Sequence, residues 1–126
     1  MKNLNPKDVT WKLFIVYFTL IILTLLSNSA FGQITVRYFN AEWNKANSVE
    51  WCHTDKKGLD DCKVKYIDIG DNPDLQKKYK VVVVPTIIIF NNGEEVKRYQ
   101  ADLSFKMVAT REEVQEEIDE QLMSDF

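Results

Sequence analysis

The chain has 126 residues, of which 45% are hydrophobic and 28% charged, with only four glycines and three prolines. This composition is typical of one globular domain and excludes a disordered chain, a collagen-like repeat and a multi-domain enzyme. Acidic residues outnumber basic ones by 19 to 16, and the net charge is −3. Because lysine and arginine form no dense stripe, nucleic-acid binding is not expected. Two cysteines and one histidine are too few for a zinc site with four protein ligands, so we predict no metal.

Residues 1–32 are predicted to be a signal peptide. Three lysines within the first twelve residues precede an apolar run over residues 13–26, and small residues follow that run. A run of this length suits the roughly 7–15 apolar residues of a secretory signal better than the roughly 20 of a spanning helix. Cleavage is expected after Gly32, or else after Ala30, and it leaves a domain over residues 33–126.

The alternative for this segment is an uncleaved anchor, in which residues 9–31 span the membrane while Lys12 reaches to its surface, and the protein contacts the membrane only through its apolar run, residues 13–26. Both interpretations export the domain, because the positive charges precede the apolar run and stay inside. We therefore expect a periplasmic or otherwise extracytoplasmic protein, or one that is anchored to the inner membrane. In such an oxidising compartment two cysteines persist as a disulfide.

The first half of the exported domain shows a strand, a helix, a strand and a short helix. In residues 34–40, Ile34, Val36 and Tyr38 alternate onto one face, as in a strand. A helix is predicted from Asn44, as its N-cap, to about Thr54, because Val49 and Cys52 share one helical face. Residues 64–69 form the second predicted strand, and residues 71–74 begin a short helix that ends near residue 79.

The second half shows two strands and a final helix. Residues 86–90 form a strand that is apolar on both faces and therefore buried. The turn at Asn91-Asn92-Gly93 returns the chain into a polar edge strand over residues 95–100. A capping box at residues 110–113 starts a helix with Val114, Ile118 and Leu122 on one face. The order is β-α-β-α-β-β-α, with a parallel first pair of strands and an antiparallel second pair.

Three segments resemble the thioredoxin family. They are residues 36–43 (VRYFNAEW), residues 68–73 (DIGDNP) and residues 84–94 (VPTIIIFNNGE). The resemblance implies an α/β protein with a minimal thioredoxin fold, in which a four-stranded mixed sheet carries helices on both faces. It also implies a cis peptide bond before Pro85. The strand and helix that usually open a thioredoxin have no room between Gly32 and Ile34.

The sequence departs from the family at the catalytic motif. Where thioredoxins have Trp-Cys-Gly-Pro-Cys, this chain has Trp43-Asn44-Lys45-Ala46-Asn47. Thiol–disulfide exchange needs a thiolate that attacks and a second thiol that resolves the mixed disulfide, and asparagine supplies neither. The positions of the family's buried carboxylate and neighbouring lysine hold Tyr38 and Tyr66. We therefore predict no catalytic residue at this motif and no cofactor.

The two cysteines of the chain lie elsewhere. Cys52 falls near the end of the first predicted helix, and Cys62 lies at the entry to the second strand. One interpretation is a structural disulfide that closes the polar loop between them, worth about 2–3 kcal/mol of unfolding free energy. The alternative is a relocated redox pair, Cys52 and Cys62, which would make the protein a thiol-disulfide oxidoreductase.

The resemblance implies a peptide-binding groove beside the proline. Its predicted residues are Trp43, Asn44, Val84, Pro85 and Thr86. A second candidate surface is the segment 101–109, which would extend the edge strand or form an exposed loop. Its apolar residues are Leu103, Phe105, Met107 and Val108. The predicted function is a non-catalytic domain that binds an extended peptide or another protein, or serves as an accessory protein.

Overall fold

In the computed structural model, the described residues are 6–29, 33–53 and 58–124. The chain divides into two compact units, Met1–Phe31 and Gly32–Phe126. The first unit contains helix α1 (Pro6–Ser29). Among the helices of the described residues, none combines the length and the apolar character that crossing a membrane requires. The predicted cleavage site at Gly32 lies outside the described residues.

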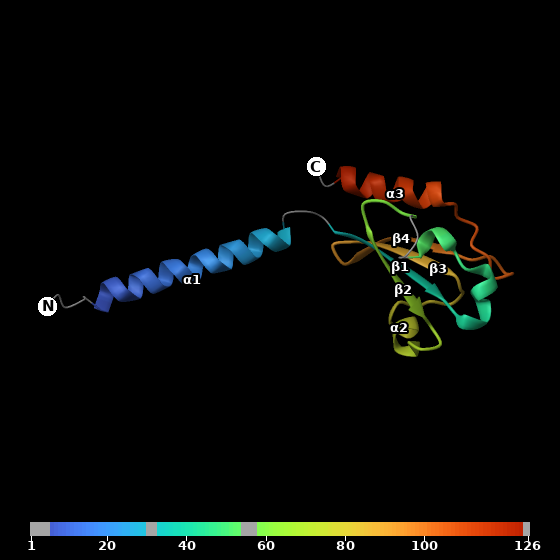
Figure 1. Ribbon diagram of the computed structural model, residues 1–126, viewed down its shortest axis with the longest axis horizontal. Helices are drawn as coiled ribbons and strands as arrows, with labels where there is room; N and C mark the ends of the chain where they lie inside the picture. Colours follow the sequence, from blue (N-terminus) through green and yellow to red (C-terminus); the bar gives the residue numbers. More distant parts are fainter. Residues whose placement is uncertain (1–5, 30–32, 54–57, 125–126) are drawn as a thin grey trace. The chain divides into compact units, whose positions relative to one another are not determined.

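Four strands of the second unit form one mixed sheet. They are β1 (Ile34–Asn40), β2 (Lys63–Asp68), β3 (Thr86–Asn91) and β4 (Glu94–Gln100), arranged in the order β2-β1-β3-β4 (Figure 1). Strand β1 pairs parallel with β2, whereas the β1–β3 and β3–β4 pairs are antiparallel. This confirms the predicted mixed sheet and its two strand pairings, because alternating apolar residues and an Asn-Gly turn determine strand faces and hairpins locally.

The sheet is covered on both faces, and the alternation in β1 decides which residues enter which core. On one face, Ile34, Val36 and Tyr38 pack with α3 (Arg111–Ser124). This helix contributes Val114 and Ile118 to the core. Phe39 points to the opposite face, where Leu75 of α2 (Pro73–Lys78) packs against the second core. Figure 1 shows these two helices on opposite sides of the sheet, as the thioredoxin-like architecture predicts.

The helix predicted from Asn44 to about Thr54 is not formed in its described part. Two short 3₁₀ segments, η1 (Glu42–Asn47) and η2 (Glu50–Cys52), stand in its place, with extended backbone at Ser48 and Val49. Asn44 is not an N-cap, since it lies inside η1 with φ −110° and ψ 18°. Its side chain makes tertiary hydrogen bonds, and these contacts override the local preference for a helix.

Candidate functional site

The five predicted groove residues come together where β1 and η1 meet the chain that leads into β3. Asn44 donates a hydrogen bond toward the carbonyl of Val84, and the peptide bond between Val84 and Pro85 is cis. Thr86 follows as the first residue of β3, and its hydroxyl donates to the carbonyl of Val83. Four of the five residues are buried, and only Trp43, with 67% of its surface exposed, is open to solvent.

Asn44 is the centre of this site. Its side chain is only 4% exposed, and its amide nitrogen lies 3.1 Å from both the side-chain oxygen of Asn40 and the backbone carbonyl of Phe105. The carbonyl of Val84, at 3.4 Å, is a weaker third acceptor for the same two protons. The side-chain oxygen of Asn44 accepts a hydrogen bond of 2.9 Å from the amide of Asn47. Both ends of the buried amide are therefore satisfied.

The network continues inward to Tyr38. The amide of Asn40 lies 3.3 Å from the hydroxyl of Tyr38, and that hydroxyl also accepts the backbone N–H of Val49 at 2.8 Å. Burial raises the pKa of Tyr38, so the phenol remains protonated. Tyr66 packs beside it, with 5.3 Å between ring centroids. The positions that the resemblance assigns to a carboxylate and a lysine thus hold two neutral rings in contact.

The segment over residues 101–107 closes the site from outside. The backbone N–H of Ala101 donates to the carbonyl of Pro85 at 3.0 Å, and Phe105 places its carbonyl on the amide of Asn44. The ring of Phe105 packs edge to face on Trp43, with 5.2 Å between the ring centroids. This segment therefore contacts the site at Pro85, Asn44 and Trp43.

The sequence singled out Asn47 in the altered motif and Phe105 in the segment 101–109, but it predicted no contact of either residue with Asn44, and it did not single out Asn40. The spacing of three between Asn44 and Asn47 is a signal for their contact, because it brings side chains together within one helical turn. No sequence pattern marked the carbonyl of Phe105. That contact depends on a backbone atom brought in from 61 residues away.

The predicted disulfide between Cys52 and Cys62 is not formed, because both residues are free thiols. Cys52 is completely buried in the core beneath α3, where it packs as a small apolar side chain. Cys62 is partly buried against the same core. The prediction that a covalent bond closes the loop between the two cysteines was therefore wrong.

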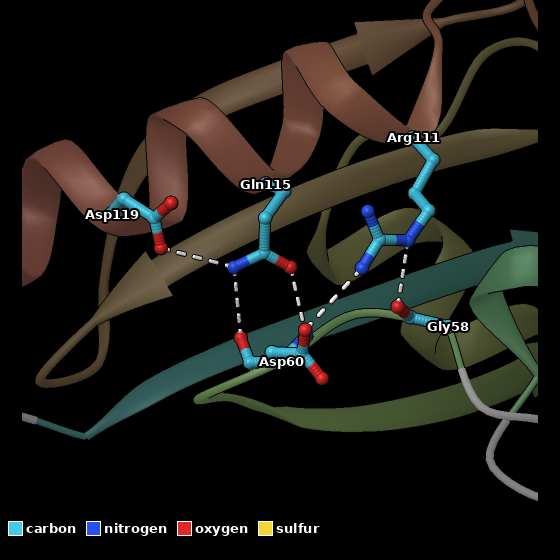
Figure 2. Close-up of polar contacts among 5 residues, drawn as sticks. All are labelled: Gly58, Asp60, Arg111, Gln115 and Asp119. Atoms are coloured by element: carbon cyan, nitrogen blue, oxygen red, sulfur yellow. Dashed lines mark hydrogen bonds and ion pairs between the residues drawn. The ribbon is translucent and has the colours of Figure 1, made fainter.

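Hydrogen bonds to α3 fix the loop instead (Figure 2). Arg111 donates to the carbonyl of Gly58 at 2.8 Å and forms an ion pair of 3.4 Å with Asp60. Gln115 accepts the backbone N–H of Asp60 at 2.8 Å and donates to its carbonyl at 3.1 Å. Asp119 accepts a further hydrogen bond from Gln115 and orients its amide. The segment that leads to Cys62 is thus held by a polar network, without a covalent cross-link.

The environments of both cysteines disfavour thiolates. Burial raises the pKa of the Cys52 thiol well above its ordinary range, and the nearby Cys62 raises it further. Burial, followed by the negative charges of Asp60 and Asp61, raises the pKa of Cys62 to about 11. Since the thiolate is the nucleophile in disulfide exchange, these surroundings oppose the chemistry that a redox pair needs.

An open cleft of about 330 Å³ adjoins the covered site. Its lining comes from residues 47–51 on one side and from residues 106, 107 and 109 on the other, and it includes Trp51 and Met107. Lys106 and Glu50 also line it. In the part of the chain that the structure describes, no group of three or more His, Cys, Asp or Glu residues is arranged to hold a metal ion. The lining of the cleft combines aromatic, apolar and charged side chains.

Comparisons with known proteins agree with this architecture. A protein-family model described as Thioredoxin matches residues 33–118. Among solved structures, a mutant thioredoxin from Halobacterium salinarum is 21% identical, with a TM-score of 0.56, over 71% of this chain and 75% of that one. Thioredoxin 1 from Thermosipho africanus is 21% identical, with a TM-score of 0.52, over 72% of this chain and 97% of its own.

Thioredoxin from Fasciola hepatica is 22% identical, with a TM-score of 0.51, over 81% of this chain and 89% of its own. At these identities the structural matches show a common fold. No curated protein matches the sequence significantly. The family model covers well over half of the chain, and the chain therefore belongs to the thioredoxin family.

Proposed function

We propose that this protein is a non-catalytic member of the thioredoxin family that binds an extended peptide or another protein. The observation that carries the proposal is the buried amide of Asn44, which lies in the place that the family's motif gives to the attacking cysteine. An amide with satisfied hydrogen bonds cannot attack a disulfide. We interpret the Trp43–Asn47 segment as a catalytic motif that has lost both thiols and kept a structural role.

A redox function through Cys52 and Cys62 finds less support. Both thiols have raised pKa values, and Cys52 is completely buried. A redox cysteine is ordinarily accessible and has a lowered pKa. Buried thiols of this kind are also slow to oxidise, so free cysteines are compatible with an exported protein.

The proposed binding surface is the exposed apolar rim of the site, which we call the Trp43 rim. It consists of Trp43, Leu103, Phe105 and Val108, all of which are exposed. Exposed aromatic residues on an ordered framework are typical of protein-binding surfaces, where tryptophan contributes disproportionately to affinity. The nearby ion pair between Glu42 and Lys45 adds no net charge beside Trp43, which suits an apolar peptide better than nucleic acid.

We further propose that the domain acts outside the cytoplasm, with residues 1–32 as its signal peptide. The support is the sequence pattern: lysines, a fourteen-residue apolar run, and a flank of small residues. Under this proposal the mature protein begins at Gln33, directly before β1.

The binding proposal is tested by selecting peptides from a random phage-displayed library on the immobilised full chain. The pool that is recovered is then tested against Trp43→Ala and against Met123→Ala, which also removes an exposed apolar side chain but lies on α3. We expect Trp43→Ala to reduce recovery about tenfold or more, as loss of a central tryptophan does at interfaces, and Met123→Ala to have no effect. Equal recovery on all three proteins, or no enrichment at all, would contradict the proposed function.

A further inference from the structure

The segment that covers the site is a tight turn held by its own hydrogen bonds. One carboxylate oxygen of Asp102 accepts the backbone N–H of Ser104 at 2.9 Å and that of Lys106 at 3.1 Å. The backbone N–H of Asp102 donates to the carbonyl of Lys106, and the carbonyl of Asp102 accepts the N–H of Phe105. Ala101 and Met107 form an antiparallel β-bridge where the turn begins and ends. We call residues 102–106 the 102–106 turn. These hydrogen bonds fix the backbone of the turn, which contacts Asn44 through the carbonyl of Phe105.

The turn docks on the site through one residue. The carbonyl of Phe105 accepts the Asn44 amide at 3.1 Å, and the ring of Phe105 packs on Trp43 at an interplanar angle of 90°. Phe105 adopts φ +62°, a left-handed conformation that is unfavourable for a residue with a Cβ atom. Docking these two groups therefore requires an unfavourable backbone conformation at the residue that makes the contact.

Burial of apolar surface does not explain this arrangement. Leu103, at the tip of the turn, is 100% exposed, and the side chain of Phe105 itself remains 41% exposed. In these contacts the turn supplies a backbone carbonyl to the amide of Asn44 and an aromatic ring to the indole of Trp43. A peptide residue with an aromatic side chain would present the same two groups, a carbonyl and a ring.

We infer that the 102–106 turn is an internal ligand that occupies the site, and that the external ligand is an extended peptide with an aromatic residue. The carbonyl of that residue accepts the amide of Asn44, and its ring replaces Phe105 on Trp43. This inference rests on the proposed binding function and specifies its ligand. The occupied site has a low apparent affinity, because the external peptide binds only the fraction of molecules in which the turn is undocked.

The test uses a variant that frees the face of Trp43 and leaves only the carbonyl of residue 105 for the peptide to displace. Phe105→Gly removes the ring, retains the carbonyl, and places glycine at a φ value that it adopts readily. The control, Met123→Ala, removes an exposed apolar side chain that lies on α3, outside the Trp43 rim. The probe is a synthetic nonapeptide that copies residues 101–109, blocked at both ends, and a second peptide has alanine in place of its phenylalanine.

Binding is followed by NMR through the indole N–H signal of Trp43 in the full chain. We expect the nonapeptide to bind Phe105→Gly at least tenfold more tightly than it binds the unmodified chain and Met123→Ala. The alanine peptide should lose this binding, and adding Trp43→Ala to Phe105→Gly should abolish it. Equal affinity for all three proteins, or binding that is indifferent to the phenylalanine, would overturn the inference.

A second selection keeps the result independent of the nonapeptide and of the folding of one variant. The random library is selected on the unmodified chain and on Phe105→Ala, and we expect the recovered peptides to share an aromatic residue. Peptides that depend on Trp43 but share no aromatic residue would show that the binding function is correct and the internal-ligand inference wrong. Absence of any Trp43-dependent peptide would show that both are wrong.

Discussion

Replacing Asn44 with alanine is expected to lower the free energy of unfolding by about 3 kcal/mol. The substitution removes the donor that serves Asn40 and Phe105 and the acceptor that serves the Asn47 amide. Because Asn40 is almost completely buried, its oxygen would be left without a partner and without access to bulk water. Urea unfolding followed by circular dichroism measures the change.

The matched control for this prediction is Asn72→Ala. Asn72 is partly buried, and its amide makes one hydrogen bond of 3.0 Å to the carbonyl of Asp68. This substitution should cost about 1 kcal/mol. If Asn44→Ala and Asn72→Ala destabilise the protein equally, Asn44 is not the centre of a buried network, and the structural role that we assign to the altered motif is incorrect.

Replacing Gly58 with alanine is expected to destabilise the fold by about 3 kcal/mol, at the upper end of overpacking effects. A Cβ atom at this position would lie 1.8 Å from the carbonyl oxygen of Trp51, which is a backbone atom and cannot rotate away. The carbonyl of Gly58 also receives Arg111. Any shift that relieves the clash therefore disturbs the network that anchors the loop to α3. Thermal unfolding of the variant measures the effect.

Gly70→Ala provides the comparison. A Cβ atom there would approach only a side-chain oxygen of Asp68, at 3.0 Å, and that side chain can adjust. We expect a change in unfolding free energy below about 1 kcal/mol. A similar loss of stability in both variants would mean that the close approach of Gly58 to Trp51 is not what restricts this position.

The parts of the fold that sequence predicts well are those specified by local pattern. The alternation of Ile34, Val36 and Tyr38 determines the face of β1, and the apolar residues of α3 follow one helical stripe. The capping residue Thr110 likewise accepts the backbone N–H of Glu113 at 3.2 Å. Each of these features depends on residues a few positions apart, so the sequence carries the whole signal.

The site was predictable only in part, because its contacts connect distant segments. The predicted helix from Asn44 followed local propensity, whereas the asparagine amide binds the carbonyls of Val84 and Phe105 across long stretches of chain. The predicted disulfide relied on spacing and compartment, and neither shows that Cys52 packs completely into a core. The family resemblance predicted a groove at Trp43, Asn44 and residues 84–86 but carried no information on the 102–106 turn, which contacts Asn44 and Trp43.

The central claim, that this thioredoxin-fold protein carries no working redox site, is tested most directly by the intact mass of protein recovered from its native host. The sample is treated with iodoacetamide at pH 7.5, once folded and once unfolded, without reductant. With a pKa of about 11, Cys62 should react about 300-fold more slowly than an ordinary thiol, because its thiolate fraction is smaller by that factor. Buried Cys52 should not react in the folded protein.

The account predicts no rapid labelling of the folded chain, two labels after unfolding, and a mass that begins at Gln33. Labelling of either cysteine within seconds in the folded protein would reveal a reactive thiolate. Cysteines that resist labelling after unfolding until a reductant is added would reveal a disulfide between Cys52 and Cys62. Either result would contradict the inert thiols described above and return these two residues to the centre of the protein's function.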